Sequence, residues 1–255
     1  MVQQASLAFF LPVAAAYLAA CAAWYALIRL APGVWPVQAP PTTDRPRLDF
    51  ALALVAPLGV LLLGQLYRMG WLLPRVGAPP VRRLLWVANN LIIYAPLFLV
   101  LAARRQGLAT VYLSARRLWL KVALGLALGA LAAALFLALR GETPRLVRVL
   151  TGAADLGRLA DFVPVFLEGV GLAFLLVRLG WLVGERTAAL VPALLFAAAH
   201  IPSGLASGRT AGELATFFAF NVALVTVILR VVQRGRDVVV LGLVHYVMDV
   251  AIEAI

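Results

Sequence analysis

Long uncharged apolar runs dominate the chain, and short segments rich in arginine, proline and glycine separate them. A bilayer core about 30 Å thick requires about 20 apolar residues in a helix that crosses it. Lipid offers no hydrogen-bond partners, so a spanning segment must satisfy its backbone internally, which favours helices. Apolar and polar residues do not alternate with a sustained period of two, so a membrane β-barrel is not expected. The sequence therefore predicts an all-α, polytopic transmembrane helical bundle.

We predict about eight helices, folded as a single integral membrane domain over residues 1–255. Their expected bounds are 5–30, 50–68, 84–104, 116–140, 160–183, 187–200, 211–232 and 237–254. The loop 31–49 is polar and rich in proline and cannot span. The sixth segment, only about 14 residues long, is too short to cross lipid alone. We expect it to be packed among other helices or to stop part-way, and Pro202 is expected to end it.

The charge distribution indicates lipid as a partner and excludes nucleic acid. Only 13% of the residues are charged, and the net charge is +11, whereas soluble domains average about 25% charged residues. The arginines fall between the apolar runs, as expected at lipid headgroups, and form no basic stripe interleaved with aromatic residues. With eight helices, the odd-numbered loops carry about 13 Lys and Arg and the even-numbered loops about 9. This bias predicts that the odd-numbered loops are cytoplasmic.

Four ionisable residues lie within apolar segments, where a charge costs about 2.5–3.5 kcal/mol at the centre of a helix. They are Glu168, in the fifth helix, His200, at the end of the sixth, and the pair His245 and Asp249 in the last. Each also has a structural interpretation: a protonated Glu bonded to a neighbouring helix, a His that satisfies helix carbonyls, and a His–Asp pair that satisfies itself. Together, however, the four groups are sufficient to activate water and to stabilise an oxyanion. Three further charged residues are expected to be interfacial rather than catalytic: Arg178, Glu185 and Arg186.

The order and spacing of these residues resemble the CPBP family of intramembrane proteases, which includes CAAX prenyl-protein endopeptidases and bacteriocin-processing or bacteriocin-immunity proteins. The family pattern is Glu-Glu-x-x-x-Arg, then Phe-x-x-x-His, then His-x-x-x-Asn/Asp. Phe196–His200 matches the second motif and His245–Asp249 matches the third. The resemblance covers residues 160–252, which we interpret as a protease core. In the first motif only Glu168 matches, because Gly169 and Ala173 stand where the family has the second Glu and the Arg.

The resemblance implies an endopeptidase that hydrolyses a hydrophobic or lipidated peptide within a prokaryotic cell membrane. Glu168 and His200 would hold and deprotonate a water molecule. His245 would stabilise the oxyanion, and Asp249 would either orient His245 or, when protonated, donate to the oxyanion. No cofactor is required for this chemistry. A zinc ion held by Glu168, His200 and His245 is an alternative, although the chain lacks an H-E-x-x-H motif.

Two other classes of function stay open. The incomplete first motif is compatible with a catalytically inactive homologue that binds a membrane partner or peptide without cleaving it. Ionisable groups within a membrane can also form a proton relay in a transporter. A transporter is less favoured, because the first four helices contain few polar residues, chiefly Gln65, Asn89, Asn90 and Tyr94.

Overall fold

The computed structural model describes residues 7–35, 37, 39–74, 76–155 and 157–255, and within these residues the chain is all-α. The α-helices are α1 (Leu7–Leu30), α2 (Pro46–Arg68), α3 (Pro79–Ala103), α4 (Leu118–Leu139), α5 (Leu146–Ala153), α6 (Leu159–Val183), α7 (Glu185–Ala188), α8 (Leu190–Ala199), α9 (Ile201–Ala206), α10 (Ala211–Gly235) and α11 (Val238–Glu253). Short 3-10 helices follow α3 and α4, at Leu108–Val111 and Thr143–Arg145. Seven helical runs in the described part are long and apolar enough to cross a membrane. The predicted polytopic bundle is confirmed.

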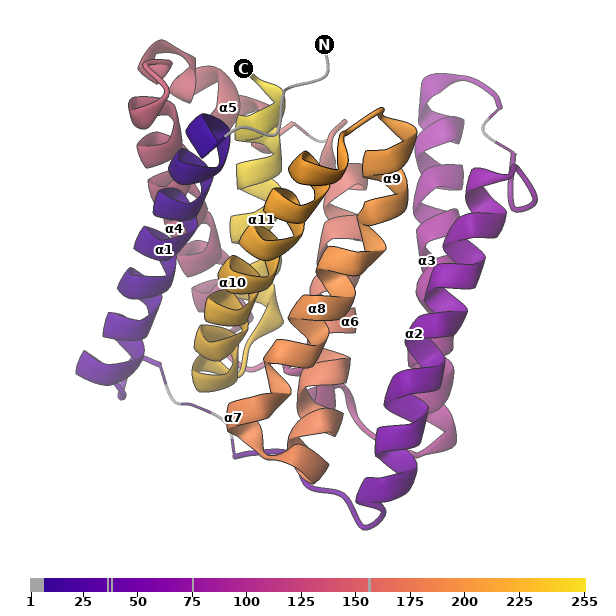
Figure 1. The fold of residues 1–255 in the computed structure, drawn as a ribbon. Coiled ribbons are helices and arrows are strands. Elements are labelled where there is room, and N and C mark those ends of the chain that lie inside the picture. Colours follow the sequence, from indigo (N-terminus) through magenta and orange to yellow (C-terminus); the bar gives the residue numbers. More distant parts are fainter. Residues whose placement is uncertain (1–6, 36, 38, 75, 156) are drawn as a thin grey trace.

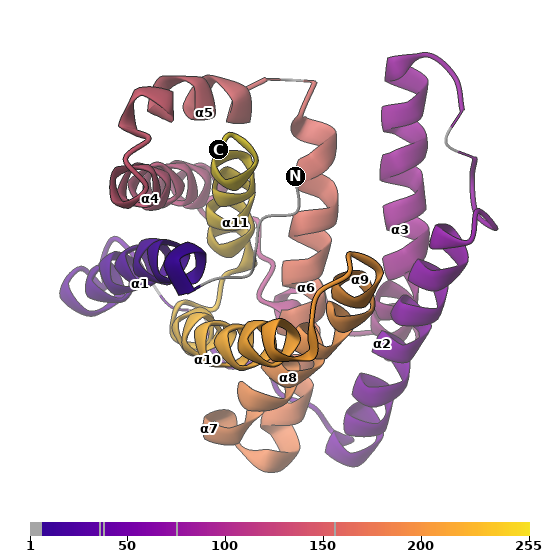
Figure 2. The ribbon, with the colours of Figure 1, turned by 45° about the horizontal axis from the view of Figure 1, so that its top comes forward.

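Six helices form a closed ring, in which α1 contacts α4, followed in turn by α11, α6, α8 and α10, which returns to α1. The antiparallel pair α2 and α3 packs against α6 on the outside of the ring (Figures 1 and 2). Helix α11 is only 16 residues long, but most of its side chains are buried between α4, α6 and α5. The start of α1 and the end of α11 lie at the same end of the bundle (Figure 1).

Small residues allow α11 to approach its neighbours closely. On α4, a Cβ atom added to Gly125 would lie 2.8 Å from the Cβ of Leu243, and one added to Gly129 would lie 2.9 Å from the Cβ of Val247. These two glycines form the G-x-x-x-G spacing that brings membrane helices into backbone contact. On the other side of α11, Gly242 faces Phe166 of α6, where an added Cβ would come within 3.0 Å of the ring. Glycine thus fixes α11 tightly between α4 and α6.

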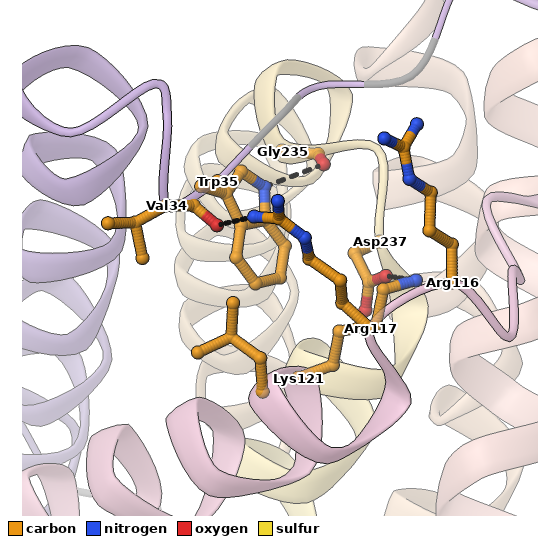
Figure 3. A pocket seen from close by; sticks show the side chains of 8 residues that line it. Val34, Trp35, Arg116, Arg117, Lys121, Gly235 and Asp237 are labelled. Atoms are coloured by element: carbon orange, nitrogen blue, oxygen red, sulfur yellow. Dashed lines mark hydrogen bonds and ion pairs between the residues drawn. The ribbon is translucent and has the colours of Figure 1, made fainter.

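A buried ion pair holds the beginning of α11 (Figure 3). Asp237 caps the helix by accepting hydrogen bonds from two of its first N–H groups, and its other oxygen lies 2.5 Å from the ammonium of Lys121 on α4. The small pocket beside this pair has a volume of about 20 Å³. Trp35 and Arg117 close it by donating to backbone carbonyls, the indole to Gly235 and the guanidinium to the chain beyond α1. Burial raises the pKa of Asp237 above its ordinary value, despite the opposing effect of Lys121.

The sixth predicted segment is longer than expected. Helices α7, α8 and α9 form one apolar run, Glu185–Ala206, whose 22 residues are enough to cross a membrane. The predicted helix end near His200 is confirmed, because α8 ends at Ala199 and His200 lies in a turn, but Pro202 does not end the span. It lies in the first turn of α9, where the N–H that proline lacks would have no helical partner in any case. The expectation that this segment is too short to cross lipid is therefore wrong, whereas its expected packing among other helices agrees with the contacts of α8 with α6 and α10.

Other boundaries differ for similar local reasons. Helices α2 and α3 begin four or five residues earlier than predicted, at Pro46 and Pro79, because proline is favoured in the first turn. The short helix α5 was not predicted, since its eight residues are too few to give a spanning pattern. Residues 5 and 6 of the first predicted helix lie outside the described residues.

Arg178 is fully buried instead of facing lipid headgroups as predicted. Its guanidinium stacks on the Phe174 ring at 3.8 Å from the ring centroid and donates to the side chain of Gln106 and to the carbonyl of Thr110. This contact ties the C-terminal part of α6 to the segment after α3. Glu185 and Arg186 are exposed at the end of the bundle, as expected for interfacial residues.

Candidate functional site

A cavity of about 260 Å³ lies between α1, α6, α8, α10 and α11, and three of the four predicted site residues line it. His200 reaches it from the junction of α8 and α9, whereas His245 and Asp249 reach it from one face of α11. Most of the other lining residues are apolar or aromatic and come from α1, α6, α8, α10 and α11. They include Phe9, Phe10, Val13, Leu172, Phe196, Phe217, Phe220, Leu224 and Leu241. The cavity is therefore a largely apolar chamber with a few convergent polar groups, as is typical of a binding site.

His245 lies between two carboxylates. Its Nδ1 atom is 3.9 Å from an Oε atom of Glu168, and its Nε2 atom is 3.6 Å from an Oδ atom of Asp249. Both separations exceed the usual 2.7–3.2 Å range of a hydrogen bond, so these are ionic contacts when His245 is protonated. Positive charge on the imidazole would be offset from both sides. The structure thus brings Glu168, from α6, to the His–Asp pair of α11.

The packing of α6 against α11 explains this approach. Gly242 lets the two backbones come together, and His245 follows it by three residues on the same face of α11. Glu168 follows Phe166, the residue that Gly242 contacts, by two positions on α6. The close contact at Gly242 thus lies within about one helical turn of both His245 and Glu168.

Glu168 also lines a second cavity, of about 290 Å³, between α6, α8 and the pair α2 and α3. Leu172 and Phe196 contribute to the walls of both cavities and so separate them. The second cavity is apolar, and several leucines in its lining are exposed on the outside of the bundle, including Leu58. It therefore connects the surroundings of Glu168 with the face of the molecule that contacts lipid.

His200 has one ring nitrogen committed to its own helix. Its Nδ1 atom lies 2.8 Å from the carbonyl oxygen of Phe196, and its ring lies against the Phe196 ring, with centroids 4.5 Å apart. A carbonyl oxygen can only accept, so Nδ1 must carry the proton in this hydrogen bond. In the neutral ring, Nε2 is then an acceptor available to a water molecule. Among the described residues Glu168 pairs with His245 and not with His200, so a joint action of Glu168 and His200 on one water stays a prediction.

Two polar residues of the site were not identified from the sequence. Tyr17 on α1 lines the central cavity, and its ring packs edge-on to His245 with the centroids 6.3 Å apart. Asn221 on α10 lines the same cavity, and its amide donates to the carbonyl of Phe217. Each is an isolated polar residue in an apolar run, and this sequence pattern could have identified it as a candidate site residue. Tyr94, one of the polar residues noted in the third predicted helix, lines the second cavity beside Glu168.

The arrangement does not fit the zinc alternative. Glu168, His200 and His245 do not come together as a group that could hold a metal ion, and no other set of three His, Cys, Asp or Glu side chains among the described residues does so. Zinc requires its ligands at about 2.0–2.3 Å from one point, and the described side chains present no such point. We therefore derive no chemical step through a metal.

Comparisons with known proteins identify no similar protein. The chain matches no protein-family model, no curated protein and no solved structure. Its long apolar helices show a polytopic helical membrane protein in contact with lipid, with seven candidate spans in the described residues.

Proposed function

We propose that the protein is an intramembrane endopeptidase that uses Glu168 and the two histidines to cleave a hydrophobic peptide with an activated water. The observation that best supports this proposal is the 3.9 Å contact between Glu168 and His245 beside an apolar cavity that also receives His200 and Asp249. A carboxylate and imidazoles in an apolar chamber can serve as general bases and acids. Electrostatic stabilisation of developing charge is also stronger where water is excluded.

In the proposed reaction, the water oxygen attacks the carbonyl carbon of the scissile peptide bond and gives a proton to Glu168. Protonated His245, flanked by Glu168 and Asp249, would stabilise the resulting oxyanion. Collapse of the tetrahedral intermediate breaks the C–N bond, and the proton held by Glu168 passes to the leaving amine. Nε2 of His200 would accept a hydrogen bond from the water and hold it in position. The products are a carboxylic acid and an amine, so one water is consumed for each bond cleaved.

The second cavity supports a hydrophobic or lipidated substrate within the membrane. Its walls are apolar, and leucines from α2 and α8 line it where they are exposed to lipid, Leu58 at 63% and Leu195 at 39%. A substrate held in the bilayer could approach Glu168 along this side without first entering water. This route also accords with the resemblance to the CPBP family, whose substrates include lipidated proteins.

A second candidate is a protein of the same kind that binds a peptide without cleaving it. The observation in its favour lies in the first motif, where Gly169 and Ala173 replace the second Glu and the Arg of the family pattern. Both positions are buried, and no neighbouring side chain takes the place of the missing arginine in the central cavity. The described cavity-lining residues therefore supply less positive charge for an oxyanion than the family pattern would.

Cleavage of a fluorogenic hydrophobic or prenylated peptide by the purified protein tests the proposal. We expect cleavage by the wild type and loss of it in both Glu168→Ala and His200→Ala. Peptide binding without cleavage by the wild type would favour the inactive candidate. Proton flux into proteoliposomes without any peptide cleavage would favour a transporter over both.

A further inference from the structure

We propose that a cleft between α1, α7 and α10 binds the headgroup of an anionic phospholipid. The cleft has a volume of about 630 Å³ and lies apart from the two cavities of the candidate site. It is lined by Tyr25, Val183, Gly184, Glu185, Arg186, Arg230, Val231, Gln233 and Arg234. Figure 1 places α7 and the C-terminal ends of α1 and α10 at the same end of the bundle.

The charge of the cleft favours an anion. Its lining contains three arginines and one glutamate, which gives a net charge of +2. The glutamate, Glu185, is already engaged with Arg236, at 3.7 Å. The side chains of Arg186 and Arg234 are exposed and have no hydrogen bond or ion pair with the rest of the described chain. Guanidinium groups bind phosphate oxygens through paired N–H donors, so these two side chains are suited to a phosphodiester.

The cleft is also rigid enough to be a defined site. Arg230 donates to the backbone carbonyl of Arg186, and Gln233 donates to that of Glu185 at 3.0 Å. These bonds fix α7 against the last turns of α10. On the opposite wall, the hydroxyl of Tyr25 accepts a hydrogen bond from the guanidinium of Arg29 at 2.9 Å, which brings a further cation beside the cleft.

The surroundings identify the anion as a lipid and not as a soluble phosphate. The cleft lies at the ends of membrane-spanning helices, where headgroups reside and basic pockets between helices bind anionic lipids. Exposed apolar side chains lead from it toward the middle of the bilayer. Leu18 lies two turns before Tyr25 on α1 and is 44% exposed, and Val227 lies one turn before Arg230 on α10 and is 42% exposed. These faces would contact acyl chains while the arginines hold the headgroup. The cleft also lies at the end predicted to be cytoplasmic, the side at which anionic lipid gives membranes a negative surface potential.

Native mass spectrometry of the full-length protein in neutral detergent tests this site. The probe is dioctanoyl phosphatidylglycerol, and dioctanoyl phosphatidylcholine and inorganic phosphate serve as comparisons. The test variant is Arg186→Gln with Arg234→Gln, which removes two charges without removing a hydrogen bond. Its matched control is Arg68→Gln with Arg148→Gln, two exposed arginines at the opposite end of the bundle.

We expect the wild type to bind phosphatidylglycerol in preference to phosphatidylcholine, and the test variant to bind it roughly thirtyfold more weakly. The control variant should match the wild type, and the pair Arg186→Lys with Arg234→Lys should bind between the wild type and the test variant, because it keeps the charge but loses the paired N–H donors. Equal loss in the test and control variants would overturn the site, since net charge alone would then explain binding. Equal affinity for the two lipids would also overturn it. Displacement of phosphatidylglycerol by millimolar inorganic phosphate would overturn the lipid assignment in favour of a soluble anion.

Discussion

Glu168→Gln should separate catalysis from stability. The substitution keeps the size of the side chain but removes both its charge and its ability to accept a proton. Even with His245 protonated, two charges about 4 Å apart attract each other by only about 4 kcal/mol at an effective dielectric constant of 20. The two side chains are 28% and 26% exposed, and solvation leaves pairs with such access to water worth about 1 kcal/mol or less.

The expected change in melting temperature is therefore small, about 4 °C at most for a chain of this size. The loss of activity should be far larger, because removal of a general base lowers kcat by about 10²–10⁴-fold. Cleavage of the fluorogenic peptide in detergent gives kcat and KM, and a thermal melt of the same sample gives stability. We expect kcat to fall and KM to change little, since Gln fills the same space beside the substrate.

Glu253→Gln is the matched control, because that carboxylate is 69% exposed and forms an ion pair with Arg158 at 3.2 Å. It should leave kcat unchanged. The mechanism is refuted if Glu168→Gln retains kcat within about threefold of the wild type, a smaller effect than general-base catalysis supplies. A loss of activity accompanied by collapse of the thermal transition would instead assign Glu168 a structural role.

Three further predictions follow from packing, titration and cavity shape. Gly125→Leu should lower the melting temperature by several degrees, because its Cβ would lie 2.8 Å from that of Leu243 and overpacking costs about 1–3 kcal/mol; Gly64→Leu, which has open space, is the control and should have little effect. Burial raises the pKa of Asp237. Between the unfolded pKa, about 4, and the raised folded pKa, the Asp237 carboxyl is protonated in the folded chain and ionised in the unfolded chain. The stability that protonated Asp237 contributes is therefore lost as the pH rises through this window. Melting curves of Asp237→Asn should accordingly depend less on pH than those of the wild type, and an unchanged dependence would exclude Asp237 as the source. Phe196→Ala should join the two cavities and raise kcat/KM for peptides with bulky residues relative to small ones, whereas unchanged selectivity would show that Phe196 is not part of the barrier.

Hydropathy was sufficient to place the long helices, because the bilayer leaves few alternatives to an apolar helix of about 20 residues. Hydropathy did not predict features that depend on a single residue and its local contacts. The sequence pattern predicts a stop at Pro202, although a proline two residues after a break equally suits the first turn of the next helix. Arg178 was placed at the headgroups because it lies near the end of an apolar run, and only tertiary contacts reveal the aromatic ring and the polar partners that enclose it.

The candidate site was predictable in part for the same reason. The four-residue spacing of His245 and Asp249 places them on one face of any helix, so their proximity follows from the sequence. The neighbour of Glu168 does not follow from it, because that depends on which helices pack together. Helices α6 and α11 pack together, and Glu168 lies 3.9 Å from His245, whereas His200 is bonded to its own helix. Tyr17 was missed because it lies more than 200 residues before His245, its partner in space.

The hydrogen bonds of the polar residues distinguish structural groups from functional ones. Asn89 bonds both backbone groups of the loop residue Leu73, and Asn221 bonds the carbonyl of Phe217 in its own helix. Such groups have their polar atoms satisfied, and stability alone accounts for them. Glu168 and His245, by contrast, form no hydrogen bond with any described residue and face each other at 3.9 Å beside an apolar cavity. Their contacts are ion pairs, Glu168 with His245 and His245 with Asp249, and both side chains keep the capacity for a further hydrogen bond to a water molecule or a substrate. This contrast supports the proposed role of Glu168 and His245, which the asparagines do not share.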